Sequence, residues 1–291
     1  MIRAEWVLII ATVMWGTSWI PLHGFAAMGL SGMPMVLAGY GLIGVLSVPL
    51  VFSQRARWQG QIWGLLAIVG FGGWANAALV SSLSLADDLV RVMLLFYLAP
   101  VWSVLGGWLW LRERVTALRW LALSLAMTGI VLTLGVGPEV IRPLAGADWL
   151  ALSAGLGFAL NNLATRAADQ IPMASKTFAA FIGSALFAWL ACGFTDQSLP
   201  ALPLSGWLLV AAFAVGWLLV ATLAAQYGVS HLEAGKSAVL IVFELIAAVC
   251  SAAWLGDQSL GPVEWLGAAL VAIAAIMAAW PETPEPALMR S

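Results

Sequence analysis

The chain has 291 residues, of which 63% are hydrophobic and only 9% are charged, and its mean hydropathy is +0.98. This composition excludes a soluble globular protein, because so much apolar surface cannot remain in water. A formal net charge of −2 gives no reason to expect a nucleic-acid partner. The expected surroundings are membrane lipid.

Ten apolar stretches are long enough, at about 20 residues each, to cross a hydrocarbon layer roughly 30 Å thick. In chain order they cover residues 5–21, 33–52, 61–83, 89–111, 117–134, 149–165, 175–192, 205–227, 234–255 and 263–280. The connections between them are short, so the sequence predicts no extramembrane domain.

The chain contains an internal repeat. Identical residues recur 143 to 145 positions apart, as Trp6 and Trp149, Gly72 and Gly216, Leu111 and Leu255, and Trp120 and Trp265. Each copy holds five stretches, and an odd number predicts that the second copy crosses the membrane in the opposite sense. Many secondary transporters are built from such inverted repeats, with the binding site near the midplane. We therefore predict an all-α polytopic membrane protein, with ten transmembrane helices as two inverted five-helix repeats around a central cavity.

The repeats are expected at residues 1–145 and 146–280, followed by a disordered cytoplasmic tail at 281–291, which is rich in proline. With the N-terminus inside the cell, ten of the twelve Lys and Arg residues fall in or beside cytoplasmic segments. Only Arg91 and Arg142 fall outside. This strong positive-inside bias predicts a multi-pass protein of the cytoplasmic (inner) membrane, with both termini in the cytoplasm.

Glu244 is the carboxylate that the pattern places deep in the hydrocarbon, within the ninth stretch. An isolated ionised group there costs roughly 2.5 kcal/mol or more, so we expect it to be protonated, solvated or partnered. Its functional interpretation is a proton site or a partner for a substrate amine. The structural alternative is a neutral carboxyl that bonds to neighbouring backbone.

Pro100 lies at the middle of the fourth stretch, where the repeat aligns it with Glu244. Proline cannot donate an amide hydrogen and clashes with the carbonyl of Phe96, so a kink is expected there. Tyr97 lies on the same face and needs a partner for its hydroxyl. Its ring is a candidate wall for an apolar substrate, and packing alone is the alternative.

Other polar and aromatic groups also fall inside predicted spans. Ser18 in the first stretch aligns with Asn161 in the sixth, where Asn162 follows directly; hydrogen bonding between helices without a ligand is the alternative role. Asn76 and Trp217 lie at mid-depth, and Trp19 and Trp102 also lie within spans rather than at their ends. We expect some of these to line an aromatic cavity, against lipid contact or core packing as the alternative.

Catalytic chemistry would need a nucleophile with its base, a metal cluster or a phosphate cradle. The two histidines, His23 and His231, lie near span ends, and the sequence contains no HExxH, GxSxG or GxxxxGK[ST] motif. We therefore predict a protein that is not an enzyme and uses no cofactor or metal. No Lys or Arg falls at the midplane, which argues against phosphorylated substrates. The expected substrate is a small, neutral or zwitterionic and partly apolar molecule.

Three segments resemble a known family: WGTSWIPLHG from residue 15, YLAPVWSVLGGWLWLRERV from residue 97, and FELIAAVCSAAWLGDQSL from residue 243. They are similar to the paired repeats of the drug/metabolite transporter superfamily, in its ten-helix EamA branch. The mid-span Pro100 followed by Leu111 and Glu113 is typical of that branch. The resemblance implies a basket-shaped exporter whose cavity is lined by helices 1, 3, 4, 6, 8 and 9.

Within that branch the chain most resembles aromatic amino-acid exporters. Two departures stand out: Glu244 is followed by Leu245 where the family commonly has proline, and Gly256-Asp257 replaces Gly-Glu. The first departure weakens the expectation that both repeats kink alike. The leading hypothesis is export of neutral, including aromatic, amino acids and related metabolites by alternating access, with protons as a candidate coupling ion. The alternatives are efflux of drugs and apolar cations, which needs an essential membrane carboxylate, and a multispanning membrane enzyme.

Overall fold

The computed structural model describes residues 3–58, 60–86, 89–135, 143–255 and 261–280, and across these residues the chain is helical with no strand. The helices are α1 (Ala4–Gly16), α2 (Trp19–Ala27), α3 (Gly32–Ser53), α4 (Ile62–Leu85), α5 (Leu89–Phe96), α6 (Ala99–Leu109), α7 (Ala117–Thr133), α8 (Gly146–Ala167), α9 (Met173–Phe194), α10 (Leu204–Phe213), α11 (Leu219–His231), α12 (Ala234–Ile241), α13 (Phe243–Leu255) and α14 (Pro262–Ala279). A short 3₁₀ turn, Arg55–Trp58, follows α3, and a π-helical segment, Ala214–Leu218, joins α10 to α11. The predicted tail at 281–291 lies outside the described residues.

All ten predicted spans are helical, which confirms the all-α membrane fold. Nine helical segments of the described chain are long and apolar enough to cross a membrane. The remaining span is α8, which has 22 residues but carries Asp148, Asn161, Asn162 and Arg166. Its polarity lowers its hydropathy, and three of these four side chains belong to buried residues rather than to a lipid-facing surface.

Four spans are interrupted: α1 and α2 form the first, α5 and α6 the fourth, α10 and α11 the eighth, and α12 and α13 the ninth. The fourth breaks at Tyr97 and Leu98, as Pro100 predicts, because proline occupies the first turn of α6. The ninth breaks at Val242, 144 residues after Leu98, although it lacks the proline. Both copies are therefore interrupted at equivalent points, which corrects the expectation drawn from Leu245.

Close helix contacts surround these breaks. A Cβ on Gly155 of α8 would lie 2.6 Å from the Phe96 carbonyl oxygen, the group that Pro100 leaves without its helical donor. A Cβ on Gly16 of α1 would collide with the Glu244 carbonyl oxygen at the other break. Glycine is required at both positions because no side chain fits between the backbones.

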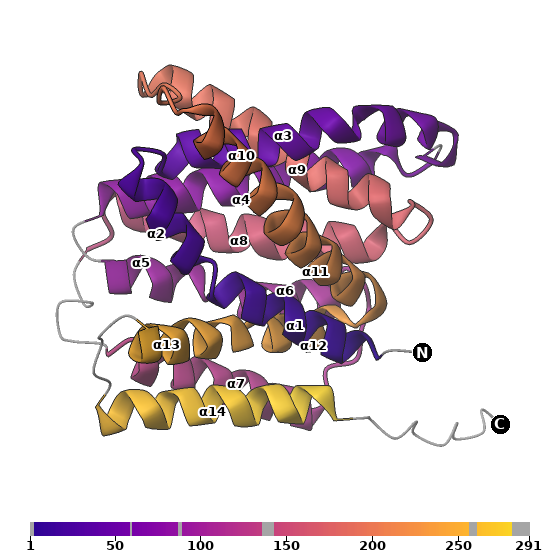
Figure 1. The fold of residues 1–291 in the computed structure, drawn as a ribbon. Helices are drawn as coiled ribbons and strands as arrows, with labels where there is room; N and C mark the ends of the chain where they lie inside the picture. Colours follow the sequence, from indigo (N-terminus) through magenta and orange to yellow (C-terminus); the bar gives the residue numbers. More distant parts are fainter. Residues whose placement is uncertain (1–2, 59, 87–88, 136–142, 256–260, 281–291) are drawn as a thin grey trace.

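The two copies interlock into one bundle (Figure 1). In the main packing pairs, α1 contacts α11 and α13, α3 contacts α9, α4 contacts α8 and α9, α6 contacts α8 and α12, and α7 contacts α14. Each pair joins a helix from residues 1–145 to one from residues 146–280, which is the pattern that a twofold relation between the copies would produce. The opposite membrane orientation of the copies stays a prediction.

Candidate functional site

A cavity of about 260 Å³ lies inside the bundle, next to the helix breaks at Leu98 and Val242. Its walls come from α1, α3, α4, α5, α6, α8, α9, α11, α12 and α13, so both copies contribute. The family resemblance implied walls from helices 1, 3, 4, 6, 8 and 9. The structure adds α3 and α9, the second and seventh spans, through Tyr40 and Ser184.

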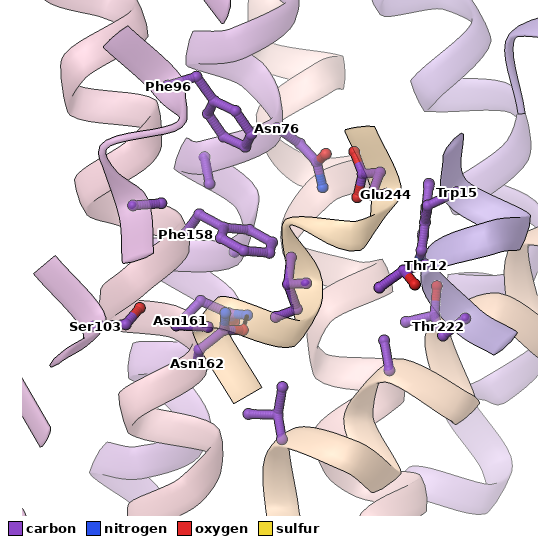
Figure 2. Close-up of a pocket in the computed structure, with 18 of the residues that line it drawn as sticks. Thr12, Trp15, Asn76, Phe96, Ser103, Phe158, Asn161, Asn162, Thr222 and Glu244 are labelled. Atoms are coloured by element: carbon purple, nitrogen blue, oxygen red, sulfur yellow. Dashed lines mark hydrogen bonds between the residues drawn. The ribbon is translucent and has the colours of Figure 1, made fainter. Parts of the chain in front are cut away.

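Six of the ten residues expected at the site line this cavity: Asn76, Tyr97, Pro100, Asn161, Asn162 and Glu244. They come from four different spans, and the fold brings them together around the breaks. Figure 2 shows Asn161 and Asn162 on α8, and Glu244 on α13, which follows the break at Val242.

The other four expected residues do not line the cavity. Ser18 donates its hydroxyl hydrogen bond to the Trp15 carbonyl oxygen over 2.6 Å, and Trp19 donates from Nε1 to Ser251 Oγ over 2.9 Å. Trp217 donates from Nε1 to the Met14 carbonyl oxygen over 3.0 Å. Trp102 is 37% exposed on the outside of the bundle. Three therefore stabilise helix ends or helix contacts, and the fourth faces lipid.

Glu244 occupies the first turn of α13 and faces the cavity. Its carboxyl makes no hydrogen bond or ion pair with any described residue. Tyr40 and Tyr97 line the same cavity. No Lys, Arg or His is among the described residues that line the cavity. Glu244 is thus a carboxyl group without a cationic partner in a partly apolar chamber.

Amide and hydroxyl groups also line the cavity. Asn76 Nδ2 donates to Ser184 Oγ over 2.6 Å, and Asn161 Nδ2 donates to Asn162 Oδ1 over 3.5 Å. Three further lining atoms are buried without a partner in the described structure: Asn161 Oδ1, Thr222 Oγ1 and Gln226 Oε1. Buried polar atoms are seldom left unpaired, so these atoms point to a ligand or water in the cavity.

Aromatic rings form two of the walls. Phe96 packs with Phe158 and with Tyr97, at ring-centroid distances of 5.8 Å and 5.6 Å. Trp15, on α1, lies across the cavity from them (Figure 2). Trp15 and Phe158 occupy equivalent positions in the two copies, 143 residues apart. An apolar or aromatic ligand group therefore has ring surface available on both sides.

Sequence reasoning missed several polar lining residues, including Thr12, Tyr40, Ser103, Thr222 and Gln226. A signal was present for those on α1 and α11. Leu8, Ala11, Thr12 and Trp15 follow the spacing of one helix face, as do Thr222, Ala225, Gln226 and Val229. Only tertiary packing reveals that these two faces meet the cavity rather than lipid.

One end of the bundle, here called the basic end, carries the start of α1, the end of α14 and most of the described Lys and Arg residues (Figure 1). Polar contacts join neighbouring spans there. Glu113 Oε2 accepts a hydrogen bond from the Ala234 amide over 2.8 Å, and its Oε1 lies 3.6 Å from Arg166 Nε. Arg119 pairs with Glu233, and Lys236 Nζ lies 2.8 Å from Glu5 Oε1. These contacts join the start of the ninth span to the first and fifth spans and to the segment after α6, join that segment to the sixth span, and so hold this end together.

A second set of contacts at the basic end involves Lys176 of α9. Its Nζ donates to the Thr165 carbonyl oxygen over 3.0 Å and to Ser230 Oγ over 2.8 Å, and Arg166 donates to the Ser230 carbonyl oxygen over 3.1 Å. The opposite end is held differently. Arg91 Nε donates to Asp148 Oδ1 over 2.9 Å, and this buried pair joins α5 to α8.

Residues 2–135 match the model of the EamA-like transporter family. The first copy of the repeat is thus similar to EamA-like transporters. No curated protein matches the chain. A solved structure described only as "Crystal structure of protein" has the same fold, with a TM-score of 0.77 and 17% sequence identity over 95% of this chain and 96% of that one. The match and the nine long apolar helical segments of the described chain support a multi-pass membrane protein.

Proposed function

We propose that this protein is a transporter of the drug/metabolite type, which exports neutral amino acids, including aromatic ones, and related small metabolites across the cytoplasmic membrane by alternating access. The observation that carries the proposal is the cavity, which combines aromatic walls with unpaired polar atoms and one carboxyl group beside two helix breaks. Its volume of about 260 Å³ is below the range of about 300–1,000 Å³ typical of sites for drug-sized ligands. It therefore suits one small metabolite.

The lining provides a place for each part of an amino acid. Glu244 is positioned to bind the ammonium group, and the rings of Trp15, Phe96 and Phe158 offer stacking surface to an aromatic side chain. Side-chain amides and hydroxyls such as Asn162 and Thr222 are the neutral donors available for a carboxylate. Glu244 is also the group best placed to exchange a proton if transport is proton-coupled.

The contacts at the basic end support the alternating-access part of the proposal. With that end in the cytoplasm, as the positive-inside bias favours, they hold the cavity closed on the cytoplasmic side. Export then requires these contacts to separate so that substrate enters from inside. Breaks at Leu98 and Val242 offer hinge points because helical hydrogen bonding is interrupted there.

Counterflow in proteoliposomes tests the proposal. Vesicles loaded with unlabelled phenylalanine should accumulate labelled phenylalanine, tryptophan and leucine, and empty vesicles should not. Phe158→Ala should reduce the rate for aromatic substrates, because it removes one ring wall. Leu156→Ala is the matched control, since Leu156 lies on the same helix but is 42% exposed on the outside. Absence of counterflow for every amino acid tested, by a protein that remains folded, would overturn the proposal.

A further inference from the structure

The cavity has an unbalanced charge. Glu244 contributes a carboxyl group, and no Lys, Arg or His is among the described residues of the lining. Tyr40 and Tyr97 also line the cavity, but neither carries a positive charge. A carboxylate in a chamber of low polarity is costly unless a cation or several donors approach it. A ligand with a positive group would provide the missing partner.

Unpaired acceptors reinforce this imbalance. Asn161 Oδ1 and Gln226 Oε1 are amide oxygens without a partner, and their residues are 8% and 6% exposed. Several neighbouring donors are already used, since Asn76 Nδ2 bonds to Ser184 and the Thr12 hydroxyl bonds to the Ile9 carbonyl oxygen over 2.7 Å. These two oxygens are acceptors that no described donor satisfies. An ammonium group, which has three donors, can bond to such oxygens, whereas a carboxylate, which has no donor, cannot.

We propose that the cavity selects its substrate by the ammonium group, bound at Glu244, and that a substrate carboxylate is dispensable. The inference rests on the proposed function, since it concerns the same cavity, and it names arylalkylamines as substrates that bind more tightly than the corresponding amino acids. The aromatic ring lies between Trp15 and the Phe158 wall. The ammonium group points to the helix break at Val242, where Glu244 lies in the first turn of α13.

Charge arithmetic distinguishes the two ligand classes. An arylalkylammonium ion and the Glu244 carboxylate sum to zero, so each offsets the desolvation cost of the other. A zwitterionic amino acid brings a second carboxylate into the same chamber, which leaves one negative charge and no cation to receive it. That extra anion is repelled by Glu244 and loses its hydration. An arylalkyl carboxylate without an amine meets only repulsion and should not bind.

Three molecules with the same phenyl ring test the inference without any substitution: phenethylamine, phenylalanine and 3-phenylpropionate. Their dissociation constants for the purified protein come from stabilisation against thermal unfolding, because a ligand that binds only the folded state stabilises it by RT ln(1 + [L]/Kd). We expect phenethylamine to bind at least tenfold more tightly than phenylalanine, and 3-phenylpropionate to give no stabilisation.

Substitution of the carboxyl group then locates the interaction. Glu244→Gln should weaken phenethylamine binding at least tenfold and reduce the preference for it over phenylalanine. Glu264→Gln is the matched control, because Glu264 lies at the start of α14, outside the cavity lining. If Glu244→Gln fails to fold, the ranking of the three ligands on the wild-type protein still decides the question.

The outcomes separate this inference from the proposed function. Tighter binding of phenylalanine than of phenethylamine would overturn the ammonium-selective site and leave an amino-acid exporter standing. Binding of 3-phenylpropionate as tight as that of phenethylamine would overturn it as well. No binding of any of the three, by a folded protein that also lacks counterflow activity, would overturn both.

Discussion

The contact between Glu113 and Ala234 provides a direct test of closure at the basic end. Glu113→Ala removes the acceptor that lies 2.8 Å from the Ala234 amide nitrogen. Because Ala234 is 2% exposed, its amide would be left without a partner in the closed conformation, at a cost of about 1–3 kcal/mol. The loss of Arg166 as a partner adds little, since that side chain is 33% exposed and 3.6 Å away.

In an open conformation water would satisfy the same amide, so the cost falls on the closed state alone. A shift of about 1–3 kcal/mol changes the ratio of closed to open molecules about 5- to 150-fold. Glu113→Gln keeps an acceptor and should shift the ratio much less. Gly107→Ala should act like Glu113→Ala, because its Cβ would lie 2.8 Å from Glu113 Oε2 and displace the carboxyl from Ala234.

The assay is cysteine labelling from the cytoplasmic side. Cys192 and Cys250 are first replaced by alanine, and Ser103→Cys places a reporter in the cavity wall. Inside-out vesicles are then treated with a membrane-impermeant maleimide. The labelling rate should rise about 5- to 150-fold in Glu113→Ala and Gly107→Ala and change little in Glu113→Gln. Unchanged labelling in both disruptive variants, with normal protein abundance, would refute this explanation of closure.

Four further expectations follow from the same geometry. Burial raises the pKa of the Glu113 carboxyl, and Glu233 adds to the effect while the Ala234 amide, Arg166 and Arg119 oppose it. In the closed conformation Glu113 therefore binds a proton more tightly than an exposed carboxyl does, so closure strengthens as the cytoplasmic pH falls toward 4.5 and weakens as the pH rises. Cytoplasmic labelling of Ser103→Cys should slow on acidification, and Glu113→Gln should remove that response. Tyr97→Ala should reduce counterflow at normal abundance, whereas the lipid-facing Trp102→Ala should not; equal effects would point to packing. Gly155→Val should destabilise the protein by about 1–3 kcal/mol or more, measured by thermal unfolding, because its side chain meets the Phe96 carbonyl. Cysteines placed after Arg55 and near Lys176 should label from the cytoplasm. One placed near Glu139, which lies outside the described residues, should label from the other side of the membrane. The reverse pattern would exclude the proposed orientation.

Hydropathy predicted the helices well because each span must be long and apolar whatever its neighbours are. Depth in the membrane likewise predicted that Asn76, Tyr97 and Glu244 lie near the centre of the bundle. Depth does not fix rotation about the helix axis, however. Trp102 and Trp217 have the depth of cavity residues, but one side chain faces lipid and the other bonds to the Met14 carbonyl oxygen.

Helix contacts between the copies account for most of what the sequence did not reveal. Gln226 and Thr222 looked like ordinary polar residues of a span until α11 was seen to pack against α1 beside the cavity. The break at Val242 has no proline to signal it. It lies where Gly16 brings α1 against the Glu244 carbonyl, a contact between residues more than two hundred positions apart.

The most direct test of the central claim is a structure determined with 4-bromophenylalanine, whose bromine can be located by its anomalous scattering. The proposed site predicts a bromine peak between the Trp15 and Phe158 rings, with the ligand nitrogen within hydrogen-bonding distance of the Glu244 carboxyl. A ligand bound at full occupancy elsewhere on the protein, with the cavity unchanged, would contradict the assignment of this cavity as the substrate site.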